Sequence, residues 1–560
     1  MLTIFSTRAR LRFAVLAAII TGLIPGLATA AGEALPQLRV DRGTTQLLVD
    51  GKPFLIRGGE LRNSTASSLR YLNQFWEKLE HMRLNTILAP AYWELLEPDE
   101  GRFDFQTVDD LISQARQHHM KVVLLWFGSW KNGASSYVPD WIKRDQARFR
   151  RVVRSDGTGA EILSAVSSSN LEADAKAFST LMDHLRAMDG TQHTVIMVQV
   201  ENEIGLKPEP RDHSPAADAA FAAAVPKELM TYLSAHQTEL APEVEGAWRA
   251  HGYQRGANWQ KTFGSSPQTD EIFNAWVAAR YTGLVAAAGK AKYPLPMYVN
   301  AALIRDGFAP GQYPSGGPLP HLFDIWRAAA PEIDLISPDL YFPNFPEWTS
   351  KYSRPGNALF IPEVGGVPAA EIAANAFFAF GELHAIGFSP FGIETFSDDR
   401  AALIGRCYDI LGQLTPLISS KRGTSGLRGI RPVIHYDGTA DTGPQNFHLG
   451  GYRFTASFPN SGTFIDRASA SEPVLAHGAL ILETAPDEFI VAGTGVSLSI
   501  ASDDPNEPQA HALTVRDGQF LDGVWKPDRY LNGDETDHGT HVNLPMHDFG
   551  ILRVHLYHYH

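Results

Sequence analysis

The stretch TVIMVQVENE, residues 194–203, begins as an apolar run and ends in two carboxylates that flank an amide. A strand that is apolar on both faces is typical of a parallel sheet covered by helices. Charged groups inside such a strand would be costly to bury, so we expect the carboxylates at its carboxyl end, open to solvent or ligand. The stretch therefore predicts a parallel sheet whose strand ends carry polar chemistry.

Seven further runs of the same type occur along the chain, separated by stretches that suit helices. They are FLIRGGE (54–60), TILAPAYW (86–93), KVVLLWFGSW (121–130), PMYVNAAL (296–303), IDLISPDLY (333–341), LFIPEVG (359–365) and FSPFGIET (388–395). Eight such strands alternating with helices predict an α/β fold, a (β/α)8 TIM barrel, over residues 31–415. A long insertion, residues 204–295, follows the fourth strand, and we expect it to wall the site at the catalytic face of the barrel.

The carboxy-terminal part of the chain has a different texture. Beyond about residue 416, β-rich runs such as GYRFTASF (451–458) and FGILRVHLYHY (549–559) are separated by Gly, Asp, Asn and Pro turns. This pattern predicts an all-β accessory domain over residues 416–560.

The amino terminus has the features of a secretory signal peptide. Arg8, Arg10 and Arg12 precede an apolar run, and the small residues that end at Ala30 offer a cleavage site. We therefore expect residues 1–30 to be removed and the mature protein to be periplasmic or secreted, without stable insertion in a membrane. No later run of the sequence is long and apolar enough to span a bilayer.

Charge and cysteine content exclude several partners. The chain has 62 acidic and 48 basic residues and a formal net charge of −14, which disfavours a broad phosphate-binding surface and hence nucleic acid. Cys407 is the lone cysteine, so no internal disulfide stabilises the exported chain. The oligomeric state is left open by the sequence.

Polar residues gather at the ends of the predicted strands. They are Glu60, Glu94, Glu201, Asn202, Glu203, Asn300, Asp339, Tyr341, Glu363 and Glu394. In a TIM barrel the carboxyl ends of all strands share one mouth, so these side chains are expected to converge. An acid-rich set without matching His or Cys predicts chemistry done by carboxylates, with no metal site and no cofactor.

Hydrolysis of a glycosidic bond needs one carboxylic acid that protonates the leaving oxygen and a second carboxylate that attacks or assists across the sugar. The fourth and seventh strands lie on opposite sides of an eight-stranded ring, so their acids can meet across the pocket. Burial and a neighbouring negative charge are expected to raise the pKa of the acid.

Three segments resemble the family 35 glycoside hydrolases, which are largely β-galactosidases. VQVENEIG (198–205) resembles that family's VQxENEYG block, AYWELLEPDEGRFDF (91–105) its FWNxHEPxxGxYdF segment, and SSYVPDWI (135–142) its GGLPaWL segment. The resemblance covers roughly residues 40–400. It implies that Glu203 is the general acid/base, Glu363 the nucleophile, and Asn202 the amide that hydrogen-bonds the sugar hydroxyl beside the anomeric carbon.

Several sugar contacts of that family are replaced in this chain: Pro90, Glu94, Leu96 and Ser129 stand where the family has Tyr, Asn, His and Glu. The contacts to the sugar must therefore be rebuilt by other residues at strand ends. The candidates are Glu60, Tyr92, Glu94, Trp126, Trp130, Asn300, Tyr341 and Glu394. A barrel with a β-rich tail also resembles a divergent bacterial branch linked to the galactose side chains of xyloglucan.

Glu201 is the rival of Glu203, because a regular strand would turn both side chains to the same face. The motif favours Glu203 as the acid and Glu201 as a supporting, hydrogen-bonding residue. The sequence thus predicts a retaining exo-β-galactosidase that acts on plant-type oligosaccharides or polysaccharides. The alternatives are another exo-glycosidase, such as an α-L-arabinopyranosidase, and a noncatalytic glycan-binding protein.

Overall fold

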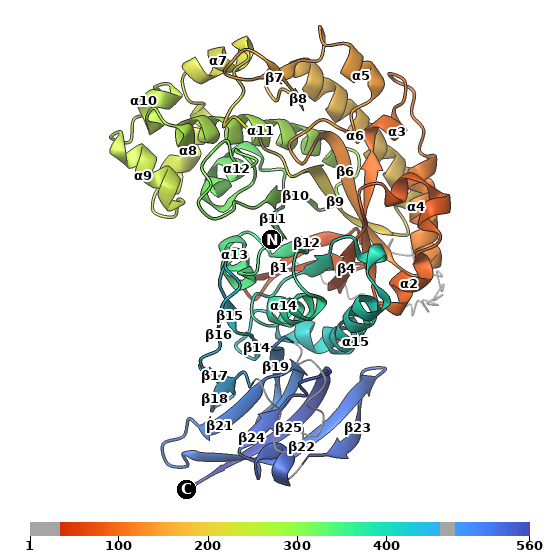
Figure 1. Ribbon diagram of the computed structural model, residues 1–560, viewed down its shortest axis with the longest axis vertical. Helices are drawn as coiled ribbons and strands as arrows, with labels where there is room; N and C mark the ends of the chain where they lie inside the picture. The colour runs from red at the N-terminus through yellow and green to blue at the C-terminus, as the bar shows by residue number, and fades with distance from the viewer. Residues whose placement is uncertain (1–33, 460–475, 532) are drawn as a thin grey trace, which may run out of the picture.

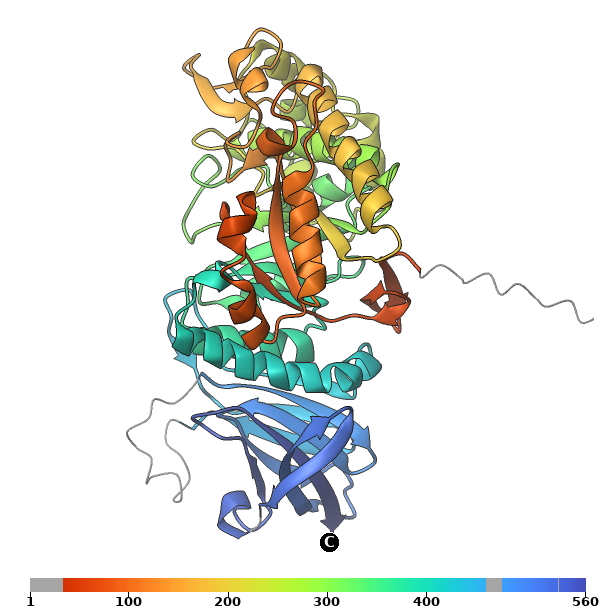
Figure 2. The same ribbon diagram turned by 90° about the vertical axis from the view of Figure 1, so that its right-hand side faces the viewer.

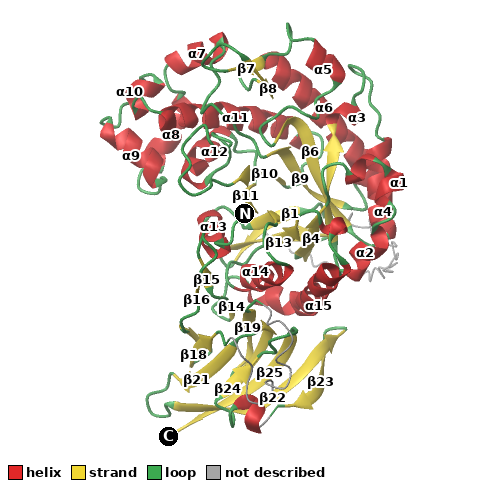
Figure 3. Cartoon of the chain, in the orientation of Figure 1, coloured by secondary structure: helices red, strands yellow, loops and turns green. Residues whose placement is uncertain are grey.

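The computed structural model describes residues 34–459, 476–531 and 533–560 (Figure 1). The predicted signal peptide, residues 1–30, lies outside the described residues. A barrel with its helices forms the larger body, and a sandwich of strands lies at one end of it. Figure 3 shows the helices around the barrel and the strand-rich carboxy-terminal part.

Eight parallel strands close into a barrel in chain order, which confirms the predicted TIM barrel. They are β4 (Ile56–Glu60), β5 (Thr86–Tyr92), β6 (Lys121–Lys131), β9 (Val195–Asn202), β10 (Met297–Ala302), β11 (Leu335–Leu340), β12 (Phe360–Val364) and β13 (Gly387–Pro390). Nearly all their residues are buried, as expected of strands with a packed interior on one side and helices on the other.

The eighth strand is shorter than predicted. β13 ends at Pro390, and Gly392 adopts a left-handed conformation with φ +64° before the 3₁₀ helix η3 (Ile393–Thr395). A residue at positive φ cannot continue a strand, and glycine adopts this conformation without steric cost. Glu394 therefore lies on a helical turn behind the strand end.

Helices cover the outside of the barrel. They are α1 (Leu69–Leu72), α2 (Trp76–His81), α3 (Trp93–Leu96), α4 (Gln106–Gln117), α5 (Asp140–Arg144), α6 (Ser168–Asp189), α11 (Pro267–Lys290), α12 (Phe323–Ala329), α13 (Phe345–Tyr352), α14 (Ala369–Gly381) and α15 (Asp398–Lys421). Local residues determine where α11 begins: the Ser266 side chain accepts a hydrogen bond from the Thr269 N–H, and Pro267 occupies the first turn.

The insertion after the fourth strand is only in part a wall of the site. Its last helix, α11, is the barrel's own helix and packs on α6, whereas α7 (Pro215–Ala222), α8 (Lys227–Ala235), α9 (Pro242–Ala250) and α10 (Trp259–Phe263) lie outside it (Figure 1). These four helices contribute no residue to the pocket described below; Lys207, in the loop that precedes them, does. The expectation that the whole segment walls the site is therefore wrong.

Smaller sheets flank the barrel. At its amino-terminal side lie β1 (Gln37–Asp41), β2 (Thr44–Val49) and β3 (Lys52–Pro53), and β7 (Arg151–Val153) pairs with β8 (Gly159–Leu163). No helix in the described ranges is long and apolar enough to cross a membrane.

The carboxy-terminal part is an all-β sandwich, as predicted. A six-stranded sheet contains β14 (Leu427–Ile430), β19 (Gly478–Ala485), β20 (Glu488–Thr494), β25 (Gly550–Tyr559), β22 (Gln509–Leu521) and β23 (Val524–Tyr530). A four-stranded sheet contains β17 (Gln445–Leu449), β18 (Tyr452–Ser457), β21 (Ser497–Ser502) and β24 (His541–Asn543). A short hairpin, β15 (Val433–Ile434) and β16 (Ala440–Asp441), lies between β14 and β17 in sequence.

The sandwich and the barrel share a hydrophobic interface. Along β19, Ile481 belongs to the core between the two sheets, whereas Leu480 and Leu482 belong to the core of the barrel. This is the two-residue period of a strand that is buried on both faces. The six-stranded sheet packs on α14 and α15, and Figure 2 shows α15 between the two bodies. The predicted limit at residues 415 and 416 falls inside α15.

Candidate active site

The carboxyl ends of the barrel strands open into a pocket of about 510 Å³. Its lining residues come from the carboxyl ends of β6, β9, β10, β11, β12 and β13 and from the loops that follow β4, β9 and β10. They are Asn63, Lys131, Asn132, Glu203, Lys207, Ala302, Leu303, Arg305, Phe308, Gln312, Tyr313, Pro314, Asp339, Tyr341, Phe342, Glu363 and Phe391.

Three carboxyl groups meet in this pocket. Glu203, Asp339 and Glu363 each place an oxygen within 4.8 Å of the others, and all three are buried. The two acids that the sequence assigns to the fourth and seventh strands are thus brought together by the ring of strands. Glu363 is the fourth residue of β12, whose register pairs it with Asp339 on β11.

Glu203 has the environment of a carboxylic acid that keeps its proton near neutral pH. Burial, followed by the negative charge of Glu363, raises its pKa from 4.5 to about 7. Its backbone N–H donates to Asn300 Oδ1 at 3.0 Å, and Asn132 Nδ2 donates to its Oε2. The backbone at Glu203 has φ +45°, an unusual value for a residue other than glycine.

Glu363 accepts hydrogen bonds that hold its carboxylate in place. The Tyr341 hydroxyl donates to Oε2 at 2.6 Å, and Asn300 Nδ2 lies 3.4 Å from Oε1. The Tyr341 ring lies against the backbone of Gly365, where an added Cβ would come within 2.8 Å of Tyr341 Cε1. Glycine at this position therefore leaves the space from which Tyr341 reaches the carboxylate.

Asn202 is fully buried beside Lys131 and is not among the residues that line the pocket. Its Oδ1 accepts from Lys131 Nζ at 2.8 Å, and its buried Nδ2 has no hydrogen-bond partner among the described residues. Because the lysine ammonium can only donate, the Asn202 oxygen must face Lys131 and the amide N–H groups must face away from it. The free N–H groups of Asn202 can then donate to a sugar hydroxyl.

Lys131 is the buried cation of this acidic pocket, only 7% exposed and 4.9 Å from the Phe127 ring centroid. The turn after β6 places it. Asn132 and Gly133 have φ of +54° and +69°, and Lys131 and Ala134 exchange backbone hydrogen bonds across them. Positive φ at both central residues is typical of a type I′ turn, which favours Asn-Gly.

Two further carboxyl groups carry a strongly raised pKa. Burial and the charge of Glu363 raise the pKa of Glu60 and of Asp339 well above their ordinary values. Glu60 lies beneath the pocket rather than in its lining, and Asp339 accepts from Asn300 Nδ2 at 2.7 Å.

Glu203, Asp339 and Glu363 are also close enough to surround a cation. The carboxylates already accept hydrogen bonds from Asn132, Asn300 and Tyr341. A second group on the sandwich, Asp504, Glu507 and His558, has similar spacing, and there His558 Nδ1 lies 2.5 Å from Glu507 Oε2.

Glu201 points away from Glu203, contrary to the expectation from a regular strand. Both residues have positive φ, +63° and +45°, so the strand is twisted out of its alternation at this point. Glu201 is fully buried and accepts from the Trp130 N–H at 2.7 Å. Burial and the nearby Asp174 raise its pKa well above the ordinary value. It supports the turn behind the site and does not line the pocket.

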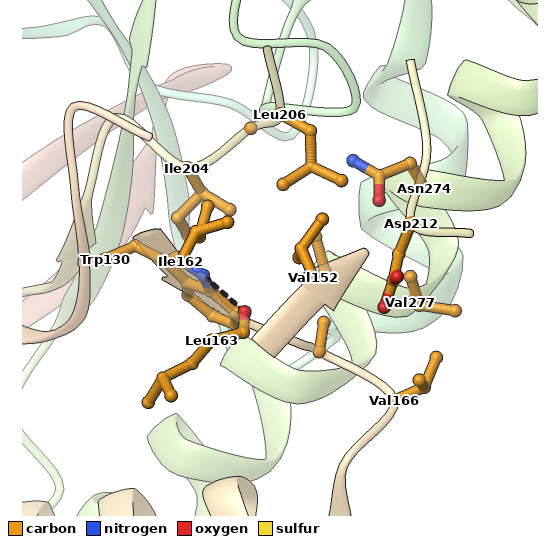
Figure 4. A pocket seen from close by; sticks show the side chains of 13 residues that line it. Trp130, Val152, Ile162, Leu163, Val166, Ile204, Leu206, Asp212, Asn274 and Val277 are labelled. Atoms are coloured by element: carbon orange, nitrogen blue, oxygen red, sulfur yellow. Dashed lines mark hydrogen bonds between the residues drawn. The ribbon is translucent and has the colours of Figure 1, made fainter. Parts of the chain in front are cut away.

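Two predicted sugar contacts are core residues instead. Trp126 is 0% exposed, and its Nε1 donates to Asp174 at 2.9 Å. Trp130 is 2% exposed, and its Nε1 donates to the Leu163 carbonyl. Figure 4 shows Trp130 in a separate, mostly apolar cavity beside Leu206 and Val152. The prediction that these rings stack on a sugar is contradicted, because their strand turns them outward from the pocket.

Tyr92, Glu94 and Glu394 also lie outside the pocket lining. Tyr92 is buried against Phe127. The Glu94 carboxylate faces Lys143 at 3.5 Å. Glu394 is buried and accepts from the Arg62 N–H and the Thr65 hydroxyl, so it fixes the loop after β4 rather than a ligand.

Asn300 and Tyr341 do belong to the site, as positioning groups for the two acids. Lys131 and Asn132 were not predicted as site residues, although the Asn-Gly pair after an apolar run is a strong turn signal that places both at the strand end. The loop of residues 303–314 was not predicted either, because it has no pattern that links it to the pocket.

Residues 70–285 match the family model described as beta-galactosidase (Glyco_hydro_42). The barrel is therefore similar to β-galactosidases. This match agrees with the resemblance to β-galactosidases seen in the sequence motifs, while membership of family 35 stays a prediction. Residues 404–543 match a model described as a domain of unknown function (DUF5597).

Among curated proteins, the chain is 28% identical over 201 residues to a β-galactosidase from Xanthomonas manihotis. The match covers 34% of this chain and 31% of the relative, so the chain spans about a third of that protein's length.

Among solved structures, a β-galactosidase from Rahnella sp. R3 is 16% identical, with a TM-score of 0.44, over 65% of this chain and 57% of that one. The catalytic domain of a β-amylase from Paenibacillus polymyxa is 12% identical, also with a TM-score of 0.44, over 64% of this chain and 98% of that one. At this level of similarity neither structure bears on what this chain does.

Proposed function

We propose that this chain is a retaining exo-β-galactosidase. The observation that carries the proposal is the short distance, at most 4.8 Å, between carboxyl oxygens of Glu203 and Glu363. Retaining glycosidases hold their two carboxyl groups roughly 5 to 5.5 Å apart, whereas inverting enzymes need roughly 6.5 to 9.5 Å to admit a water molecule. The spacing supports double displacement.

In the first step, the Glu363 carboxylate attacks the anomeric carbon while Glu203 gives its proton to the leaving oxygen, and the glycosidic bond breaks. In the second step, Glu203, now a carboxylate, takes a proton from water, which displaces Glu363 and releases the sugar. The raised pKa of Glu203 suits this double role, because the group is protonated in the free site and loses its proton near neutral pH.

Other residues position the acids and the sugar. Tyr341 and Asn300 orient Glu363, and Asn132 orients Glu203. The amide N–H groups of Asn202, which have no partner among the described residues, are free to donate to the hydroxyl beside the anomeric carbon. Galactose as the terminal sugar is supported by the match of residues 70–285 to β-galactosidases. A pocket of about 510 Å³ suits release of a terminal sugar from a longer glycan.

We further infer that the substrate is a galactose-bearing plant-type glycan, such as a xyloglucan side chain. The protein is periplasmic or secreted, as the basic and apolar amino terminus indicates.

The test is the initial rate of the wild type and of Glu363→Gln on a panel of aryl glycosides that includes a β-galactoside and an α-L-arabinopyranoside. We expect preferential cleavage of the β-galactoside and its loss in the variant. Glu347→Gln, on the exposed face of α13, is the matched control and should keep the wild-type rate. Cleavage of the arabinopyranoside alone would show that the terminal sugar is arabinopyranose and not galactose. No cleavage of any glycoside by the wild type would refute the proposal.

A further inference from the structure

The hairpin of β15 and β16 brings an aromatic residue of the carboxy-terminal region to the mouth of the pocket. Its loop carries Tyr436, whose ring lies 5.3 Å from the ring of Phe342, centroid to centroid. Phe342 lines the pocket that holds Glu203 and Glu363. The hairpin packs beside α13, as Figure 1 shows.

The aromatic rings form a continuous path from the reacting acids to the surface. Tyr341 donates its hydroxyl hydrogen bond to Glu363, and the next residue, Phe342, contacts Tyr436. Phe391 lies 6.3 Å from Tyr341 and lines the same pocket. The pocket wall beside Glu363 is therefore rich in aromatic side chains.

Tyr436 is available to a ligand. Its side chain is on a residue that is 37% exposed, and its hydroxyl has no hydrogen-bond partner among the described residues. Phe308, on the loop after β10, lines the pocket as well and is 43% exposed. Large aromatic side chains are usually buried, so exposed rings that continue a pocket mark a binding surface.

We propose that Phe342 and Tyr436 form a binding site for the part of a glycan that lies beyond the terminal sugar. This inference rests on the proposed exo-glycosidase function. An exo-acting pocket holds the terminal sugar at its closed end, so the rest of the chain leaves through the mouth, where these rings lie. The apolar face of a neighbouring sugar stacks on the rings, and the free Tyr436 hydroxyl bonds a sugar hydroxyl.

The carboxy-terminal region is thereby part of the substrate site. In this proposal the outer sugars are bound jointly by Phe342, which lines the pocket from the loop after β11, and by Tyr436 of the hairpin, which contacts Phe342 from outside the lining. Enzyme and accessory domain together then select galactosides attached to an oligosaccharide over galactosides with a small leaving group.

The test compares two substrates, an aryl β-galactoside and a β-galactose-ended oligosaccharide, in the wild type and in Tyr436→Ala. The measured quantity is the ratio of kcat/KM for the oligosaccharide to kcat/KM for the aryl galactoside. We expect this ratio to fall on the order of 10-fold, the size of one lost aromatic contact. Tyr436→Phe should lose less. Tyr530→Ala removes an exposed ring on β23 and should keep the wild-type ratio.

An unchanged ratio in Tyr436→Ala would overturn the proposal. This includes the case in which kcat/KM falls equally for both substrates, since that result indicates general damage to the fold. Binding gives a readout that does not need turnover. Calorimetry of the oligosaccharide with Glu363→Gln and with Glu363→Gln/Tyr436→Ala should show weaker binding in the double variant. Equal binding by the two variants would overturn the proposed glycan site. Weaker binding by the double variant, together with a wild type that cleaves no galactoside, would refute the exo-β-galactosidase proposal and support the glycan site.

Discussion

Replacement of Glu203 by Gln should stabilise the fold at alkaline pH. Burial and Glu363 raise the Glu203 pKa from 4.5 to about 7, so between these values the folded state binds a proton that the unfolded state has lost. Stability therefore falls as pH rises from about 4.5 to about 7 and stays low above it. A difference of roughly 2.5 pKa values corresponds to about 3 kcal/mol. Glutamine does not ionise, so the variant does not lose this stability as the pH rises.

The assay is urea unfolding of the wild type and Glu203→Gln, followed by tryptophan fluorescence at about pH 5 and about pH 9. We expect nearly equal stability at the lower pH and a gain of up to about 3 kcal/mol for the variant at the higher one. Glu347→Gln is a control of opposite sign, because hydrogen bonds from Lys351 and Asn344 lower the pKa of Glu347. If the gap between Glu203→Gln and wild type is the same at both pH values, Glu203 is not the poised acid.

Three further outcomes follow from the site. Lys131→Met leaves the Asn202 amide unfixed and should lower kcat/KM by about 10- to 100-fold, measured on the best aryl glycoside; a rate equal to wild type would show that the lysine does not orient the amide. Trp126→Phe should leave KM unchanged but lower the free energy of unfolding by about 1 to 3 kcal/mol, because it removes the hydrogen bond to the buried Asp174 Oδ1; a raised KM with normal stability would show that Trp126 contacts the sugar after all. The kcat/KM of wild type should fall above about pH 7 as Glu203 loses its proton, and a flat profile up to pH 9 would contradict its assignment as the acid.

The strands and the acid pair could be predicted from the sequence because both depend on local signals. A buried parallel strand must be apolar on both faces, so its apolar run and its polar end are visible in residues 194–203. Glu203 and Glu363 each follow such a run, as other polar residues do, and the resemblance to family 35 glycoside hydrolases selected these two; the closure of eight strands then brings them together. The length of the eighth strand was overestimated because Gly392 turns the chain.

The surroundings of the acids depended on side-chain directions that no pattern encodes. Trp126 and Trp130 belong to a strand end that is polar and aromatic in sequence. Both rings are nevertheless buried in the core, where Trp126 donates a hydrogen bond to Asp174 and Trp130 donates one to the Leu163 carbonyl. Lys131 reaches the pocket because the Asn-Gly turn reverses the chain after the strand.

The sequence by itself determined the barrel and the sandwich, because hydrophobic periodicity is a property of single segments, whereas Glu203 and Glu363 were singled out among the carboxyl groups at strand ends by the resemblance to family 35 glycoside hydrolases. Only the tertiary structure decided which carboxylate faces the pocket. Glu201 and Glu203 are two residues apart, and positive φ at both turns one toward Trp130 and the other toward Glu363. Only the packing of α13 and the hairpin decided that Tyr436 meets Phe342, since contacts between residues distant in the chain depend on the whole arrangement.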